Sequence, residues 1–292
     1  MSAVGAVEPG RSGPEPRHGR RIATIWAVAT VILVPIVIFV IGPGIPPGHA
    51  SQQASDQHQV NVVLSALATP IVLLVWVYFA YAAIFFRQRG ETIVDGPHIE
   101  GNPRIQITWL AATTTLVLGL AVYGTIGLLG SSAAGAGGGE GPSPLAKPPN
   151  VKNALEVQVI GQQWLWTFRY PGYGGVETDT LALPVGREIE FHVTSLDVAH
   201  SFWAIELGVK ADAIPGNDNV AFVKPEQVRS IQVRCAELCG LWHGEMSTRA
   251  QVMTPANFAA WIAQQQRDKA SVTKQLPPYS HIYYPDPQRR AS

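Results

Sequence analysis

Charged side chains are scarce in this sequence. Lys, Arg, Asp and Glu make up 14% of its 292 residues, whereas soluble domains carry about 25%. Basic and acidic residues number 21 each, so no excess of positive charge indicates a nucleic-acid partner. The shortage is concentrated in three uncharged apolar runs, residues 22–41, 60–86 and 105–129. Because a helix needs about 20 apolar residues to cross a membrane, we expect each run to be a transmembrane helix.

Basic residues are also missing from one of the segments that flank these runs. Residues 42–59 contain no Lys or Arg. Arginines lie instead before the first run and between the second and third: Arg11, Arg17, Arg20, Arg21, Arg87, Arg89 and Arg104. Positive residues mark the cytoplasmic side of a membrane protein. We therefore expect a multi-pass protein of the bacterial cytoplasmic membrane, with everything after residue 130 on the outer, periplasmic side.

The first apolar run has two interpretations. Its basic flank and the small residues around Gly48-His49-Ala50 are compatible with a cleaved signal peptide. The run is longer than the signal-peptide core of about 7 to 15 residues, which favours a retained transmembrane helix or signal anchor over residues 22–41. Residues 1–21, rich in Pro, Gly and Arg, are expected to form a disordered cytoplasmic N-terminus.

Short alternating runs replace the long apolar ones in the second half of the chain. A Gly- and Pro-rich linker is expected over residues 130–152, followed by a domain over 153–267. Short strands at this spacing predict a small antiparallel barrel or sandwich. A helix over 256–267, capped by Thr254, should end it, and the tail 268–292 has no assigned role. The expected strands are residues 155–160, 188–193, 220–223 and 230–234.

The chain has only two cysteines, and both lie in this domain. Cys235 and Cys239 are followed closely by His243 and Met246, so two thiols, an imidazole and a thioether share one short segment. Soft sulfur combined with imidazole favours copper or zinc, and a weak axial Met is typical of electron-transfer copper. His200, which ends the strand after Val193, is the candidate for a further ligand.

Other arrangements use fewer of these residues. A disulfide is common in exported domains, but so short a loop would stabilise little and the nearby His and Met would be accidental. A Cys2His2 zinc site leaves Met246 unused. A mononuclear blue-copper site leaves one cysteine unused. A two-copper centre is the arrangement that uses every soft ligand.

The pattern Cys-x3-Cys-x3-His-x2-Met, with His200-Ser201 upstream, resembles the ligand motif of the CuA domain of cytochrome c oxidase subunit II. Residues 161–166 (GQQWLW) resemble the aromatic segment of that family, and residues 207–216 resemble the stretch after its first copper histidine. The resemblance spans roughly residues 60–265. It implies N-terminal transmembrane helices followed by an all-β, cupredoxin-like Greek-key barrel, with residues 22–41 as an addition to the two helices of the family.

The resemblance also implies specific roles. A binuclear copper centre would be bridged by both thiolates, and the side chain of Glu237 would reach a magnesium ion at the boundary with subunit I. Trp164 would be the residue through which electrons arrive from cytochrome c. The implied metal ligands are His200, Cys235, the backbone carbonyl of Glu237, Cys239, His243 and Met246.

The implied function is that of subunit II of an aa3-type cytochrome c oxidase, a proton-translocating terminal oxidase. Its partners would be cytochrome c, subunit I, the other oxidase subunits and the lipid membrane. A CuA-bearing subunit of a nitric oxide reductase is the alternative. Two positions depart from the family pattern: Leu165 replaces an aromatic residue, and Gln106 replaces a Glu at the mouth of a proton channel, where Glu100 could substitute.

Overall fold

The computed structural model describes residues 17–87, 101–130 and 153–273 of the chain. The expectations for the first 16 residues, for Glu100, for the linker after residue 130 and for the tail after residue 273 lie outside these described residues. The chain divides into two compact units, and each is considered by itself.

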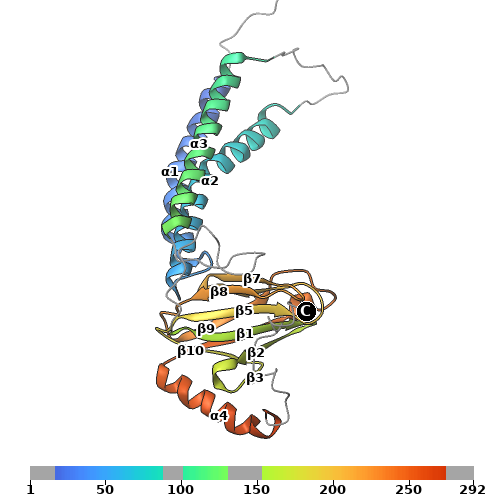
Figure 1. The fold of residues 1–292 in the computed structure, drawn as a ribbon. Coiled ribbons are helices and arrows are strands. Elements are labelled where there is room, and N and C mark those ends of the chain that lie inside the picture. The colour runs from blue at the N-terminus through green and yellow to red at the C-terminus, as the bar shows by residue number, and fades with distance from the viewer. Residues whose placement is uncertain (1–16, 88–100, 131–152, 274–292) are drawn as a thin grey trace, which may run out of the picture. The chain divides into compact units, whose positions relative to one another are not determined.

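Three helices in the first half are long and apolar enough to cross a membrane. Large apolar side chains such as Val31 and Trp76 lie exposed on them, as suits helices whose backbone groups are satisfied internally and whose surface faces lipid. Gln106 lies near the start of the third helix. The helices are α1 (His18–Ile36), which continues through the π-helical turn η1 (Val37–Ile41) and the 3-10 turn η2 (Gly42–Gly44), α2 (Gln52–Phe85) and α3 (Pro103–Gly130) (Figure 1).

The head is a sandwich of two five-stranded sheets (Figure 1). One sheet has the order β3-β2-β1-β5-β8 and the other β4-β10-β9-β6-β7. The strands are β1 (Leu155–Gln162), β2 (Leu165–Tyr170), β3 (Val176–Thr178), β4 (Leu181–Pro184), β5 (Ile189–Ser195), β6 (His200–Ala204), β7 (Val209–Ala213), β8 (Asn219–Val223), β9 (Arg229–Cys235) and β10 (Ser247–Met253).

Two strand pairings correct the expectation of a purely antiparallel domain. β1 pairs with β5 and β4 pairs with β10 in parallel. Parallel neighbours need a crossover connection, and between β1 and β5 the chain crosses to the second sheet to form β4 before it returns. The predicted fold class, apolar N-terminal helices followed by an all-β cupredoxin-like barrel, is confirmed.

Alternating side chains fill the space between the sheets. Val157 and Val159 of β1 are fully buried, and they lie opposite Phe191 and Val193 of β5 in the register of the sheet. Phe202 of β6 packs against Phe191 from the other sheet, with 5.3 Å between ring centroids. This rigid core fixes the positions of the strand ends, where the candidate site lies.

Helix α4 (Pro255–Thr273) begins as the sequence predicts. The backbone N–H of Asn257 donates to Thr254 Oγ1 at 3.3 Å, which makes Thr254 the N-cap. Phe258 and Ile262 bury one face of the helix in the core of the head.

Residues 44–61, including the first turns of α2, belong to the same compact unit as the head. The backbone of Ala50 pairs with two head residues: its N–H donates to the carbonyl of Glu206 at 3.2 Å, and its carbonyl accepts from the N–H of Glu226 at 2.8 Å. Ser51 Oγ donates to the carbonyl of Leu207 at 2.7 Å. Helix α2 therefore starts at Gln52, before the apolar run at residue 60, because its polar first turns bind the head.

Candidate metal centre

The predicted ligands come from strand ends at one end of the sandwich. His200 opens β6 and Cys235 closes β9, and the two strands pair with Phe202 opposite Cys235. The loop that carries Cys239 and His243 returns to Met246, whose carbonyl accepts a hydrogen bond from the N–H of Cys235 at 3.0 Å. Neighbouring strands of one sheet thus hold both ends of the ligand loop.

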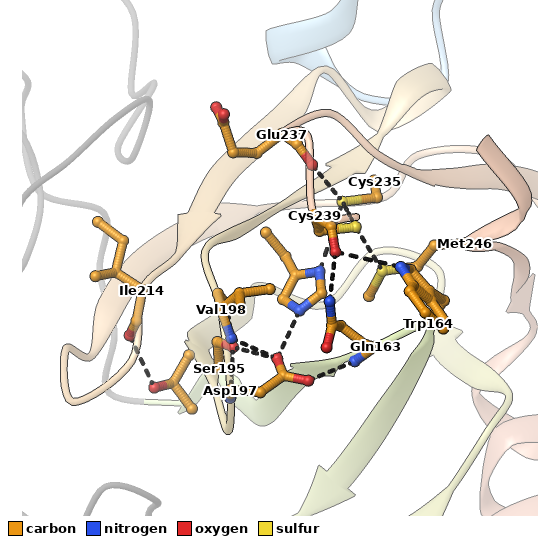
Figure 2. Close-up of polar contacts among 12 residues, drawn as sticks. Gln163, Trp164, Ser195, Asp197, Val198, Ile214, Cys235, Glu237, Cys239 and Met246 are labelled. Atoms are coloured by element: carbon orange, nitrogen blue, oxygen red, sulfur yellow. Dashed lines mark hydrogen bonds and ion pairs between the residues drawn. The ribbon is translucent and has the colours of Figure 1, made fainter. Parts of the chain in front are cut away.

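The structure brings all the predicted ligand groups around the two sulfur atoms. Figure 2 shows Cys235, Cys239, Met246 and the carbonyl of Glu237 together. Cys235 Sγ lies 3.8 Å from Cys239 Sγ, 3.8 Å from His200 Nδ1 and 3.2 Å from the carbonyl oxygen of Glu237. Cys239 Sγ lies 3.5 Å from His243 Nδ1 and 3.8 Å from Met246 Sδ. His200, Cys235 and Cys239 are buried and could hold a metal ion together.

This donor set fits a soft metal. Both cysteines are free, so their sulfurs are not joined in a disulfide. Metal–thiolate distances of about 2.3 Å allow two sulfurs to share one metal when they are up to about 4.6 Å apart, and these sulfurs are 3.8 Å apart. Thiolate, imidazole and thioether groups are all ligands that suit copper. This site offers two thiolates, two imidazole nitrogens and one thioether.

Burial controls the protonation of the Cys239 thiol. Removal from water, with a smaller contribution from the neighbouring Cys235, raises the pKa of the Cys239 thiol to about 11. A thiol with that pKa keeps its proton at neutral pH until a metal displaces it, because metal binding needs the thiolate.

Asp197 holds His200 from the side opposite the sulfurs. Its Oδ1 lies 2.9 Å from His200 Nε2, which leaves Nδ1 directed at Cys235. Burial favours the neutral carboxyl, but hydrogen bonds from the N–H of Gln163, from His200 and from the N–H of Val198 outweigh it and lower the pKa of Asp197. Asp197 was not predicted from the sequence, although it lies only three residues before His200.

Gly161 of β1 passes close to the same imidazole. A Cβ atom at this position would lie 3.0 Å from His200 Cδ2 and 3.1 Å from Trp166 Cζ3. The absence of a side chain therefore lets β1 pack directly against the ligand histidine.

Trp164 lies on the surface side of the ligand loop, half-buried between β1 and β2. Its indole Nε1–H donates to the carbonyl oxygen of Cys239 at 3.2 Å. The side-chain amide of Gln163 donates to the same oxygen at 2.8 Å (Figure 2). The sequence analysis singled out Trp164 but not Gln163, because only the folded loops bring that amide to Cys239.

Glu237 contributes its backbone to the sulfur cluster, but its side chain is exposed. The carboxylate points away from Cys235 and Cys239 (Figure 2). Among the described residues, the group of potential metal ligands that lie close together does not include this carboxylate.

Comparisons with known proteins show which family this chain resembles. The family model described as "Cytochrome C oxidase subunit II, periplasmic domain" matches residues 176–253, which include every predicted metal ligand. A cytochrome c oxidase subunit 2 from Synechocystis sp. is 30% identical over 269 residues, which cover 80% of this chain and 81% of the relative. The corresponding protein of Thermostichus vulcanus is 29% identical over 287 residues, with 84% and 86% covered.

A solved structure adds a further likeness. The periplasmic domain of subunit II of the cytochrome oxidase of Bradyrhizobium japonicum is 31% identical, and the match covers 40% of this chain and 96% of that domain with a TM-score of 0.39. The match to the Synechocystis protein extends over most of both chains. The chain therefore belongs to the cytochrome c oxidase subunit II family.

Proposed function

We propose that this chain is the electron-accepting subunit of an aa3-type, proton-translocating cytochrome c oxidase of the respiratory chain. It would receive electrons from cytochrome c at a binuclear copper centre, for reduction of dioxygen to water at the haem of subunit I. The observation that carries this proposal is the convergence of four further ligand groups around two thiols 3.8 Å apart. The relatives are oxidase subunits, so the nitric oxide reductase alternative is not favoured.

Each residue of the site would have its own role in holding copper. Cys235 and Cys239 would hold the metals through their sulfurs, His200 and His243 through Nδ1, and Met246 through its thioether. A bound copper pair supplies one-electron chemistry in which the charge is shared by two metals. The surrounding protein would limit rearrangement on reduction, because the ligands lie on paired strand ends and Asp197 fixes the His200 ring.

Trp164 would carry electrons from the surface to the ligands. One side of its ring is accessible, and its indole N–H reaches the carbonyl of Cys239. A donor that contacts the ring would be connected to a copper ligand through one hydrogen bond and the backbone of a single residue.

The remaining partners follow from the same assignment. The apolar helices would anchor the chain in the bacterial cytoplasmic membrane beside subunit I and the other subunits, with the head outside. A magnesium ion at the carboxylate of Glu237 stays a prediction; it would need further ligands from subunit I, since Mg²⁺ keeps several oxygen ligands.

The role of Trp164 can be tested in the intact oxidase with the variant Trp164→Ala. Reduction by cytochrome c, followed by stopped flow, should slow at least about tenfold, which corresponds to about 1.4 kcal/mol of activation free energy. The copper spectrum should stay the same, because Trp164 contacts a ligand's backbone and not a metal-binding atom.

Trp261→Ala is the matched control, since this tryptophan packs on Tyr170 at α4, away from the ligand loop. The control should leave the rate of reduction unchanged. An unchanged rate in Trp164→Ala would remove Trp164 from the electron path.

A further inference from the structure

A small pocket lies between the start of α4 and the turn that connects β4 to β5. Its volume is about 260 Å³, below the range of about 300 to 1,000 Å³ that is typical of small-molecule sites. This size suits one or two side chains of a peptide. The residues that make its walls apolar are Tyr173, Pro184, Val185, Pro255, Phe258 and Ala259.

The walls of this pocket are held in place by the rest of the head. Phe258 is 3% exposed and belongs to the hydrophobic core. Tyr173 ends the 3-10 turn η4 (Pro171–Tyr173), and its carbonyl accepts a hydrogen bond from the side-chain amide of Gln266 at 3.0 Å. Helix α4 runs along this side of the head beside β3 (Figure 1). The pocket is therefore preformed.

One of the lining residues is charged, Arg187. Its Nε–H and Nη2–H groups donate to the carbonyls of Asn153 and Ala154 at 3.2 and 3.4 Å. Among the residues that the structure describes, no carboxylate forms an ion pair with this guanidinium. Because a guanidinium has five N–H donors, Arg187 can bind a further acceptor, and a carboxylate gives the strongest hydrogen bonds.

The pocket lies at the end of the sandwich opposite the metal ligands. Strand β5 starts just after the β4–β5 turn and ends at Ser195, beside the loop that carries Asp197. Strand β10 starts next to Met246 and ends at Met253, two residues before Pro255. Each of these strands has seven residues, which separates its two ends by about 20 Å. The proposed electron path therefore makes no use of this pocket.

A Pro- and Tyr-rich tail follows α4. It has 19 residues after Thr273, and its middle part, residues 277–287, contains four prolines and three tyrosines. Proline-rich segments are already extended before they bind, and aromatic-lined grooves recognise them for that reason. Asp286 is the only acidic side chain in the tail, and it would complement the charge of Arg187. The tail and the pocket therefore match in both their apolar and their charged groups.

The tail is long enough to return to the pocket. Ala259 lies about four helical turns before Thr273, the last residue of α4, which is about 21 Å along the helix axis. An extended chain covers that distance in about seven residues, so residues from about 280 onward reach the pocket. Because the tail is joined to the head, its effective concentration at the pocket is about millimolar.

We propose that this pocket binds the chain's own tail. The rings of Tyr283 and Tyr284 would pack against Phe258, and the carboxylate of Asp286 would pair with Arg187. Docking would remove from water the apolar walls that the head alone leaves open. Because the pocket lies away from the ligands, the tail would dock with or without copper, which goes beyond the proposed function.

Limited proteolysis of the purified full-length chain in detergent tests this contact. Chymotrypsin cleaves after tyrosine, and mass spectrometry measures the rate at which it releases residues 284–292. Ala259→Glu should raise this rate at least about fivefold, because its carboxylate fills the pocket rim and repels Asp286, and cleavage follows the population of the open tail. Ala260→Glu is the matched control: Ala260 is also exposed on α4 but does not line the pocket, so the native rate should remain.

A charge exchange tests the ion pair within the same contact. Arg187→Glu should also speed cleavage, and adding Asp286→Arg to it should restore most of the native protection, because the pair then forms with its charges reversed. A change in the tail would not compensate if Arg187 acted only within the head. The copper EPR signal should be the same in every variant, since the pocket lies away from the ligands.

Three results would overturn the docking of the tail. One is a native cleavage rate equal to that of Ala259→Glu, which would mean that the tail does not occupy the pocket. Another is a charge exchange that restores no protection. The third is protection that disappears on dilution, which would show that a second copy of the chain fills the pocket. A missing copper signal in the native protein would instead count against the proposed function.

Discussion

At the scale of single residues, Asp197 connects the candidate ligand His200 with the segment that carries Trp164. One carboxylate oxygen holds the imidazole of His200, and the other accepts the N–H of Gln163, which precedes Trp164. The orientation of the His200 ring and that of the surface tryptophan are therefore fixed by the same side chain. Partners of this kind keep a ligand histidine in one orientation.

His192 forms a second charged cluster, on the outer face of the first sheet. Its Nδ1 lies 2.8 Å from Asp218 Oδ2, and its Nε2 lies 3.5 Å from Glu190 Oε1. Burial opposes protonation of the ring, but the carboxylates of Asp218, Glu190 and Glu156 outweigh it and raise the pKa of His192. His192 therefore has a carboxylate beside each of its ring nitrogens.

The raised pKa of His192 makes stability depend on pH. A histidine whose folded pKa exceeds its unfolded value stabilises the fold below the unfolded pKa of about 6.5, and this contribution is lost as pH rises through the folded pKa. His192→Gln should therefore lower the unfolding free energy by about 1 kcal/mol near pH 6 and by less near pH 9. Chemical unfolding of the intact chain in detergent, followed by tryptophan fluorescence, measures this difference.

His49→Gln serves as the control for that titration, since His49 is an exposed histidine. Its effect on unfolding should be small, because the side chain is exposed. A His192→Gln effect that does not shrink with rising pH would show that the pair with Asp218 contributes no charge-dependent stability.

At the scale of elements, the start of α2 was the boundary that the sequence predicted least well. An apolar run locates the part of a helix that lipid surrounds, so it predicted residue 60 as the start. The helix begins at Gln52 because Ser51 caps it, with the N–H of Ala54 donating to Ser51 Oγ at 3.0 Å. Ser51 is buried against the head through its bond to the carbonyl of Leu207. A contact between segments so far apart in the chain leaves no pattern in the local sequence.

The cap on α2 provides a prediction for Ser51→Ala. This change removes the bond to Ala54 and the bond to the carbonyl of Leu207. We expect a loss of about 1 to 2 kcal/mol of unfolding free energy, the usual cost of losing an N-cap. Thermal unfolding of the chain in detergent, compared with the native protein, measures it.

Ser55→Ala is the matched control, because Ser55 lies in the next turn and its hydroxyl bonds only within the helix, to the carbonyl of Ser51. It should change stability by less than about 0.5 kcal/mol. Equal effects of the two variants would mean that the contact of Ser51 with the head adds nothing.

For the strands, too, a local pattern predicted their positions in the chain but not their distant partners. The alternating side chains of residues 155–160 and 188–193 predicted two strands. The first segment lies in β1, and the second lies in β5 apart from Glu188. The parallel pairing of these strands could not be predicted, since it depends on the path of the chain between the sheets. Gln163 escaped notice for that reason too, because its partners Asp197 and Cys239 lie on other loops.

At the scale of the whole molecule, the division into membrane helices and head could be predicted from the sequence. Charged residues are scarce in the helical part, whereas short strands are typical of the head. The ligand spacing was visible in one segment, from Cys235 to Met246, and only His200 had to come from elsewhere. The fold supplies what the spacing could not: two thiols 3.8 Å apart, with an imidazole beside each.

The central claim is that this site holds two coppers that share one electron. Copper content and low-temperature EPR of the purified, copper-loaded protein test it most directly. The account predicts about two coppers per chain and a seven-line signal, because an unpaired electron shared equally by two copper nuclei is split by both. One copper per chain with a four-line signal, or no copper and a Cys235–Cys239 disulfide, would contradict the account.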